Sequence, residues 1–450
     1  MTRHYFGTDG IRGLANTPPM TASMALQVAM ATAEVLRARR GGEHTNRAII
    51  GKDTRLSGYM FEEAMCAGFV AMGMDVLLTG PLPTPGIAYL TRSLRCDVGV
   101  MISASHNPFQ DNGIKLFGAD GFKLADDIEQ DIERSIARDL TSALAAPGDI
   151  GKATRLDDAL GRYAECVKGS VARGQTFEGL KVVIDCAHGA AYKIAPQVLW
   201  ELEARVIAIG TAPNGRNIND GYGATAPQNL QKAVREHNAD IGLALDGDAD
   251  RLIVVDEKGQ IIDGDQLMAA LAMAMKKAGT LRHDTVVATV MSNLGLERFL
   301  QTQGIRLVRS KVGDRYVVEA MREGGFNLGG EQSGHVVLSD ISTTGDGLMA
   351  ALHILSLLKT YNKKASEALN LFTPYPQILR NVTFSGGKPL ENTKVQEAIR
   401  QAEKDMANDG RILVRASGTE PVIRVMAEGK NPGQVEAIVG NLCAVIQKAV

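Results

Sequence analysis

The chain has 450 residues, of which 45% are hydrophobic and 22% are charged, and its formal net charge is −2. A chain of this length is too long to fold around one ordinary hydrophobic core, so we expect three or four domains. The near-neutral charge gives no support for nucleic acid or an anionic membrane surface as a partner, and no apolar run approaches the roughly 20 residues that cross a bilayer. The five cysteines are scattered without a CxxC pair, which predicts reduced thiols in a cytoplasmic protein.

The N-terminal segment begins with MTRHYFGTDG, which contains no apolar signal-peptide stretch. Residues 6–13, FGTDGIRG, have three glycines that permit tight turns, and they carry Asp9 and Arg12. A dinucleotide-binding fingerprint is excluded because no strand precedes this sequence and no helix pattern follows it. Taken alone, the segment also fits a simple turn with a solvated arginine.

Three stretches of the chain repeat one order of elements, in which three strands alternate with helices. The expected strands are residues 47–55, 74–85 and 96–108, then 181–189, 204–215 and 239–251, then 284–293, 305–315 and 326–335. Such alternation predicts right-handed crossovers and largely parallel sheets, with ligands bound beyond the carboxyl ends of the strands. Each third strand ends in a polar cluster (SASHNP, DGDADR or GEQSGH), so we expect a shared site at domain junctions.

The repeated pattern ends near residue 370. ALNLFTPYPQ (368–377) contains two prolines and indicates a linker, and the strands and helices expected beyond it indicate a small α+β domain. We therefore predict an α/β fold of three similar domains with mixed, largely parallel sheets and a smaller C-terminal domain. The expected domains are residues 1–155, 156–257, 258–370 and 371–450.

The first polar cluster places Ser105 beside His106, with Lys115 ten residues further on. A serine hydrolase is one interpretation, but its nucleophile elbow would read GxSxG. Adjacent side chains on an extended backbone point to opposite faces, so His106 need not be the base of Ser105. A hydroxyl that caps the following element is the simpler alternative.

The second cluster, DGDADR, spaces Asp246, Asp248 and Asp250 two residues apart. On an extended chain their carboxylates would share one side, and a hard cation such as Mg²⁺ or Ca²⁺ would relieve their repulsion. An EF-hand is rejected because its sixth position would be Arg251 instead of glycine, and because RLIVV predicts a strand. An acidic turn without metal remains the alternative. Three carboxylates would leave room on Mg²⁺ for a phosphate oxygen.

The third cluster, GEQSGH, offers Glu331, Ser333 and His335. A carboxylate and a hydroxyl suit the vicinal hydroxyls of a sugar. Metal binding by the glutamate and the histidine is a rival, but no second histidine lies nearby in the sequence. A structural loop is the remaining alternative.

A fourth polar sequence, RASGTEP, lies between two expected strands of the C-terminal domain. Small residues and hydroxyls together with two arginines would make a phosphate site, and the residues are Arg415, Ser417, Gly418, Thr419 and Arg424. A plain hairpin turn is the alternative. No GxxxxGK[ST] occurs, so a nucleotide kinase or ATPase has poor support.

Together these clusters favour phosphoryl transfer, in which positioning and charge neutralisation do most of the work. Ser105 then fits a covalent phosphoryl carrier, whose phosphate could complete the metal shell. Lys115 and Arg12 are candidates for neutralising charge or moving a proton.

Five loops, in order, resemble those of the α-D-phosphohexomutase superfamily: GTDGIRG (7–13), SASHNPFQDNGIK (103–115), DGDADR (246–251), GEQSGH (330–335) and RASGTEP (415–421). The resemblance covers essentially the whole chain. It implies three similar α/β domains and a mobile fourth one around a central cleft. Gln332 and the sequence SDISTTGDG (339–347) resemble the glucosamine branch of the superfamily.

The resemblance also implies the site residues. They are Ser105, Lys115, Arg12 and His106 for catalysis; Ser105, Asp246, Asp248 and Asp250 for the metal; and Glu331, Ser333, His335, Arg251, Lys311, Asp314, Arg415, Ser417, Gly418, Thr419 and Arg424 for the substrate. One Mg²⁺ per active site and glucosamine or glucose 1,6-bisphosphate, as activator or intermediate, are implied as cofactors. A small sugar phosphate is the expected partner, and a homodimer is possible.

The function implied is interconversion of glucosamine 6-phosphate and glucosamine 1-phosphate through a phosphoserine enzyme, which would supply UDP-N-acetylglucosamine and peptidoglycan precursors. Three alternatives stay open. The chain could be a phosphomannomutase/phosphoglucomutase of the same superfamily, a phosphatase in which water intercepts the phosphoserine, or a catalytically silent sugar-phosphate-binding protein.

Overall fold

The computed structural model describes residues 4–40, 46–384, 386–407, 409–416 and 422–449. The chain divides into two compact units. The larger unit consists of Met1–Val290 and Val308–Asn370, and the smaller unit consists of Met291–Leu307 and Leu371–Val450. Among the described residues, no helix combines the length and the apolar character that a membrane crossing requires.

Three sheets follow one another along the chain before the C-terminal sheet. The first has the order β1(Ile11–Leu14), β5(Asp111–Gly118), β4(Val98–Ile102), β2(Arg47–Lys52), β3(Asp75–Pro81), β6(Ala153–Arg155). The second has the order β11(Ile261–Ile262), β10(Leu252–Asp256), β9(Ile241–Leu245), β7(Lys181–Asp185), β8(Arg205–Ile209). The third has the order β13(Arg306–Ser310), β12(Thr285–Thr289), β14(Leu328–Gly330), β15(Val336–Leu338).

These sheets share one topology. In each of them the first strand of the repeat lies between the second and the third, as in the order β3-β2-β4. The third strand then runs antiparallel to the strand that follows it in the chain, which gives the hairpins β4–β5, β9–β10 and β14–β15. The loops within these hairpins are the three polar clusters of the sequence. All nine expected strands are present, so the threefold α/β prediction is confirmed.

Helices cover the sheets. In chain order they are α1(Ala22–Arg40), α2(Gly58–Ala71), α3(Thr84–Ser93), α4(Asp126–Ile136), α5(Ala159–Lys168), α6(Ile194–Glu201), α7(Gln228–His237), α8(Gly264–Lys277), α10(Asp314–Gly324), α11(Gly347–Tyr361) and α12(Ala365–Ala368), with 3-10 turns at Thr141–Ala143 and Arg282–Asp284. Strands β4 (VGVMI) and β9 (IGLAL) are buried at every position, as expected for strands with both faces covered.

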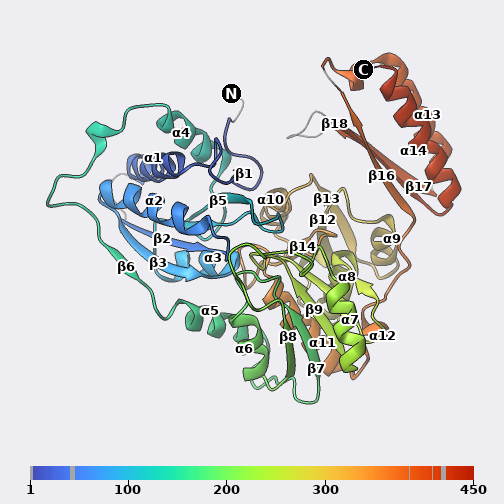
Figure 1. Cartoon of the computed structure of the whole chain (residues 1–450). Coiled ribbons are helices and arrows are strands. Elements are labelled where there is room, and N and C mark those ends of the chain that lie inside the picture. Colours follow the sequence, from blue (N-terminus) through green and yellow to red (C-terminus); the bar gives the residue numbers. More distant parts are fainter. Residues whose placement is uncertain (1–3, 41–45, 385, 408, 417–421, 450) are drawn as a thin grey trace. The chain divides into compact units, whose positions relative to one another are not determined.

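The smaller unit contains an antiparallel sheet of the order β16(Gln377–Thr383), β18(Val422–Gly429), β17(Gly410–Ala416). Helices α13(Thr393–Met406) and α14(Pro432–Gln447) lie on this sheet (Figure 1), and α9(Leu294–Thr302) and the 3-10 turn Pro389–Glu391 complete the unit. Its core includes Val395, Val425 and Val439. The expected small α+β domain is confirmed.

Two local alternatives from the sequence were wrong. The alternative that residues 6–13 form a simple turn with a solvated arginine fails because Ile11–Leu14 form β1, which pairs antiparallel with β5, and Arg12 is paired with Asp9. Residues 246–250 were considered as extended chain, but they form a turn in which Ala249 has φ 60°. The consequence for the aspartates is described below.

Candidate active site

The loop after β4 places Ser105 in a buried position with 1% of its surface exposed. Its Oγ donates a hydrogen bond of 2.6 Å to Oδ2 of Asp246, more than a hundred residues away in the chain. Ser105 has φ 51°, in the left-handed region that few residues other than glycine adopt. The two hydrogen-bonded side chains join the first polar cluster to the second.

His106 contacts Ser105 after all. Its Nδ1 lies 3.3 Å from Ser105 Oγ, within hydrogen-bond reach. The expectation that adjacent side chains diverge assumed an extended backbone, and the left-handed conformation of Ser105 removes that assumption. Burial and the positive charges of Arg251 and Arg12 lower the pKa of His106 to about 4, so its ring is neutral at pH 7.

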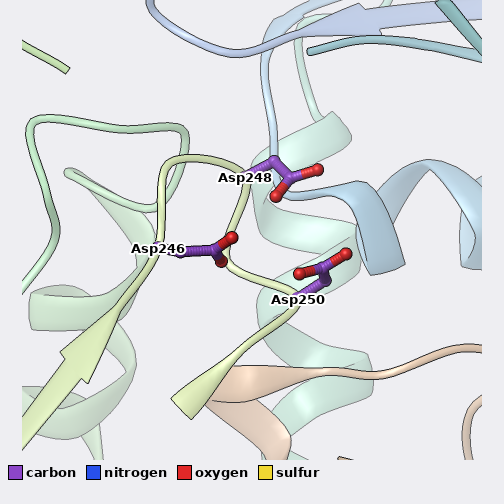
Figure 2. A group of neighbouring side chains, drawn as sticks. All are labelled: Asp246, Asp248 and Asp250. Carbon is purple, nitrogen blue, oxygen red and sulfur yellow. The ribbon is translucent and has the colours of Figure 1, made fainter. Parts of the chain in front are cut away.

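The loop after β9 brings Asp246, Asp248 and Asp250 together (Figure 2), with ligand oxygens within 4.8 Å of one another. All three side chains are buried. The three carboxylates meet because residues 246–250 form a turn. They do not meet through the alternation of side chains along an extended strand, which the sequence had suggested. Burial, then Asp250 and Asp248, raise the pKa of Asp246 to about 8, which records the crowding of negative charge.

This aspartate loop, residues 246–250, fits a hard divalent cation. Oδ1 of Asp248 and Oδ1 of Asp250 are buried and accept no hydrogen bond from the residues that the structure describes. Such oxygens need a partner, and a cation among three carboxylates supplies one. The strand β10 starts directly after Arg251, which excludes the EF-hand alternative.

Three backbone hydrogen bonds hold the carbonyls of the aspartate loop, and each comes from a different repeat. The donors are Thr84 N–H to Asp248 O (3.0 Å), Ala190 N–H to Gly247 O (2.8 Å) and Gly347 N–H to Ala249 O (3.0 Å). The hydroxyl of Thr84 also donates to Asp248 Oδ2 at 2.5 Å. The loop is therefore fixed from three sides.

Lys115, on β5, lies among the acidic groups. Its Nζ is 2.8 Å from Asp248 Oδ2, 3.2 Å from Asp9 Oδ2 and 3.6 Å from Asp250 Oδ2. Burial alone would lower the pKa of Lys115, but these carboxylates raise it above its usual value. Arg12 forms an ion pair with Asp9 beside it. Lys115 thus contacts two of the three aspartates directly, and Arg12 adjoins them through Asp9.

The GEQSGH loop adjoins the aspartate loop. Arg251 and His335 form an isolated antiparallel bridge, and Leu252 N–H donates to Gly334 O at 2.9 Å. Nδ1 of His335 lies 3.7 Å from Asp250 Oδ2, and Nε2 accepts a hydrogen bond of 3.1 Å from Gly345 N–H.

The remaining residues predicted for the substrate in this unit lie near Glu331. Its Oε1 accepts from Gly313 N–H at 3.1 Å, which joins it to the loop that carries Lys311. Ser333 Oγ lies 3.5 Å from Glu331 Oε2. Asp314 forms an ion pair with Lys123 and lies 3.7 Å from Nε2 of His335.

The smaller unit contains the two predicted arginines. Arg415 on β17 and Arg424 on β18 are direct cross-strand partners. Partial burial and the charge of Arg424 lower the pKa of Arg415. Like charges opposite each other destabilise a sheet, and a bound anion would relieve the repulsion. The other predicted residues of this phosphate loop, Ser417, Gly418 and Thr419, lie outside the described residues.

The structure adds residues that were not predicted for the site. Lys123 forms ion pairs with both Asp9 and Asp314. Arg55 and Asp53 lie beneath the Ser105 loop. The sequence signal for Arg55 and Asp53 was the polar end of a buried strand, KDTR, which resembles the ends of the other sheet strands.

Four family profiles, in order, match nearly the whole chain. They describe phosphoglucomutase/phosphomannomutase α/β/α domain I (residues 3–142), domain II (161–259), domain III (263–375) and the C-terminal domain (379–445). The chain therefore belongs to the phosphoglucomutase/phosphomannomutase family, whose members are phosphohexomutases. It is an enzyme of the isomerase class that transfers phosphoryl groups.

Individual curated relatives match the chain over its full length. Phosphoglucosamine mutase of Parvibaculum lavamentivorans is 59% identical over 447 residues, which are 99% of each chain. Phosphoglucosamine mutase of Zymomonas mobilis is 58% identical over 449 residues, which are 100% of each chain. A phosphoglucomutase/phosphomannomutase family structure from Burkholderia thailandensis shares the fold at a TM-score of 0.81 and 24% identity, covering 98% of this chain and 97% of the other.

Proposed function

We propose that the enzyme interconverts glucosamine 6-phosphate and glucosamine 1-phosphate, with Ser105 as the phosphoryl carrier. The observation that carries the proposal is the hydrogen bond of 2.6 Å between Ser105 Oγ and Asp246 Oδ2, because it puts a nucleophilic hydroxyl against a site for a divalent cation. The substrate is chosen from the full-length relatives that are named phosphoglucosamine mutases. A product of this kind would supply UDP-N-acetylglucosamine synthesis.

The reaction has two balanced transfers. Phosphorylated Ser105 gives its phosphoryl group to O1 of glucosamine 6-phosphate: the O1–P bond forms, the P–O bond to serine breaks, and the O1–H proton passes to the freed serine oxygen. The product is glucosamine 1,6-bisphosphate. After the bisphosphate reorients, Ser105 Oγ attacks the phosphate on O6, the P–O6 bond breaks, the serine proton passes to O6, and glucosamine 1-phosphate leaves with a free O6 hydroxyl.

The aspartates would hold a Mg²⁺ ion, which supplies charge neutralisation for the transferring phosphoryl group. Lys115 and Arg12 would neutralise further charge, since each forms an ion pair with a carboxylate of the site. The neutral ring of His106 is placed to accept the serine proton or return it. A bisphosphate of glucosamine or glucose would also serve to phosphorylate the resting enzyme.

The remaining residues would recognise the substrate. Glu331 and Ser333 hold ring hydroxyls in both poses, with His335, Arg251, Lys311 and Asp314 around them. Arg415 and Arg424, with the loop at Ser417, Gly418 and Thr419, bind the phosphate that is not being transferred. The cross-strand arginine pair supports this role, because two such guanidiniums suit one phosphate.

Three further properties of the protein remain predictions. They are domain boundaries near residues 155, 257 and 370, action in the cytoplasm, and assembly as a homodimer. Light scattering on the purified protein tests the dimer directly, because a mass near 48.1 kDa would contradict it.

The test of the function is a coupled assay on glucosamine, glucose and mannose phosphates with Ser105→Ala as the variant. We expect the wild type to prefer glucosamine phosphate and the variant to lose at least about a thousandfold in kcat, even with added bisphosphate. A preference for glucose or mannose phosphate would favour the phosphomannomutase/phosphoglucomutase alternative. Free phosphate released at the isomerisation rate would favour a phosphatase, and undiminished turnover of the variant would remove Ser105 from the mechanism.

A further inference from the structure

Arg55, which follows β2, holds the Ser105 loop by its backbone. The Arg55 side chain is fully buried. Its Nη2 donates to the carbonyls of Ser105 and Asn107, both at 2.8 Å. Its Nη1 donates to the carbonyl of Asp111 at 3.1 Å and to that of Pro108. One guanidinium therefore binds four carbonyl oxygens of one loop.

A second set of contacts leads from Arg55 to the amide of Ser105. Nε of Arg55 donates to Asp53 Oδ2 at 2.8 Å, and Ser103 Oγ donates to the same oxygen at 2.7 Å. Ser103 Oγ in turn accepts from Ser105 N–H at 2.9 Å. Both the amide and the carbonyl of Ser105 are thus tied, directly or through Asp53 and Ser103, to one arginine.

These contacts explain how Ser105 keeps its left-handed backbone. A serine with φ 51° is strained, and such strain persists only where the surroundings enforce it. Asn219 helps, since its Nδ2 donates to the carbonyls of Ser105 (2.9 Å) and Asn107 (3.0 Å). Arg55 and Asn219 therefore hold the same two carbonyls of the loop.

We propose that Arg55 is a positioning residue for phosphoryl transfer, because its guanidinium holds Ser105 at the one orientation in which its oxygen faces both the aspartate loop and the incoming phosphate. The inference rests on the proposed role of Ser105 as the carrier. Arginine is required because its planar fork presents five N–H donors, whereas the ammonium of lysine presents three on one atom and cannot reach all these oxygens.

The experiment compares Arg55→Lys with the wild type and with Arg37→Lys. Arg37 also donates to a backbone carbonyl, that of Met72, but it lies away from the Ser105 loop. Dephosphorylated protein is mixed with glucose 1,6-bisphosphate, and phosphate gain at Ser105 is followed by mass spectrometry. Steady-state kcat and KM and the melting temperature complete the set.

For Arg55→Lys we expect phosphorylation of Ser105 and kcat to fall about 100-fold with KM within about threefold, since small misplacements of a reacting group have effects of this size. Arg37→Lys should keep the wild-type kcat even where its melting temperature falls equally. A folded Arg55→Lys with wild-type phosphorylation and kcat would overturn the inference. A fall in kcat no larger than the fraction of the variant that is unfolded would also overturn it.

Ser103→Ala provides the answer if Arg55→Lys does not fold. It removes the acceptor of the Ser105 amide and leaves Arg55 in place, so we expect about tenfold slower phosphorylation at an unchanged melting temperature. A wild-type rate in Ser103→Ala would then refute the inference. A wild-type protein that gains no phosphate at Ser105 would refute the proposed function itself, and this inference with it.

Discussion

Lys115 Nζ lies 2.8 Å from Asp248 Oδ2, and both side chains are almost completely buried. The same ammonium also lies 3.2 Å from Asp9 Oδ2 and 3.6 Å from Asp250 Oδ2, and Asp9 forms further ion pairs with Arg12 and Lys123. In the protein without a metal ion, this one buried lysine is therefore a counter-charge shared by three carboxylates.

Replacing Lys115 with methionine should destabilise the metal-free protein by about 3 kcal/mol, because removing one partner of a buried ion pair leaves charge without compensation. Urea unfolding with and without Mg²⁺ measures this loss, and we expect Mg²⁺ to recover part of it. Lys168→Met is the matched control. Lys168 pairs with Glu165 and Glu201 near the surface, so its loss should cost less than about 1 kcal/mol. Equal losses in the two variants would contradict the special position of Lys115.

Removal of the metal should abolish turnover, and Mg²⁺ should restore it. In Asp250→Asn we expect the Kd for Mg²⁺, measured by calorimetry, to rise at least about tenfold, since one of three carboxylate ligands is lost. Asp256→Asn is the control from the same repeat, because the Asp256 carboxylate accepts from the backbone of its own turn, at Lys258 and Gln260, and from the side chain of Asn370, away from the aspartate loop. Mg²⁺ affinity that is unchanged in Asp250→Asn would exclude this residue as a ligand.

The arginine pair of the smaller unit allows a test that separates binding from stability. Arg415→Met should raise KM for the sugar phosphate at least about tenfold while the melting temperature stays the same or rises, because the variant removes a like charge opposite Arg424. Arg411→Met should do the reverse. Arg411 pairs with the buried Glu428 in the same sheet, so its loss should lower the melting temperature and leave KM unchanged. A normal KM in Arg415→Met would contradict the phosphate role.

Asp185 should make the stability depend on pH. Burial raises the pKa of Asp185 to about 6, although its carboxylate accepts from the amides of Gly223 and Ala187. A carboxyl group with a raised pKa in the folded state binds more protons there than in the unfolded chain, so stability falls as pH rises toward 6. Between pH 5 and 7.5, the wild type should lose about 1 kcal/mol relative to Asp185→Asn in urea unfolding. A difference that is constant with pH would show an ordinary carboxyl group.

Much of the fold could be predicted because it depends on local patterns in the sequence. Buried parallel strands require unbroken apolar runs, and the runs recur three times in the same order, so the repeat is visible without structure. The aspartate trio was also visible, because three carboxylates within five residues leave few arrangements in which they do not meet.

The contacts beneath the site could not be predicted in this way. Arg55 binds backbone carbonyls, and every residue has a carbonyl, so no sequence pattern marks its partners 50 and more residues away. Lys123 meets Asp9 and Asp314 across sequence separations of 114 and 191 residues. The contact between His106 and Ser105 depends on the φ angle of Ser105, which is 51°. Serine rarely adopts this left-handed conformation, so its sequence preference predicts a different backbone and no such contact.

The three hydrogen bonds that hold the carbonyls of the aspartate loop have a consequence for assembly. Ala190 belongs to the same repeat as the loop, but Thr84 and Gly347 belong to the parts of the chain before and after it, so we expect the loop to take its form only when all three parts have docked. Uptake of the ion is thereby coupled to the final stage of folding of the larger unit. A partly folded chain would contain the three aspartates but would not form the binding site for the ion.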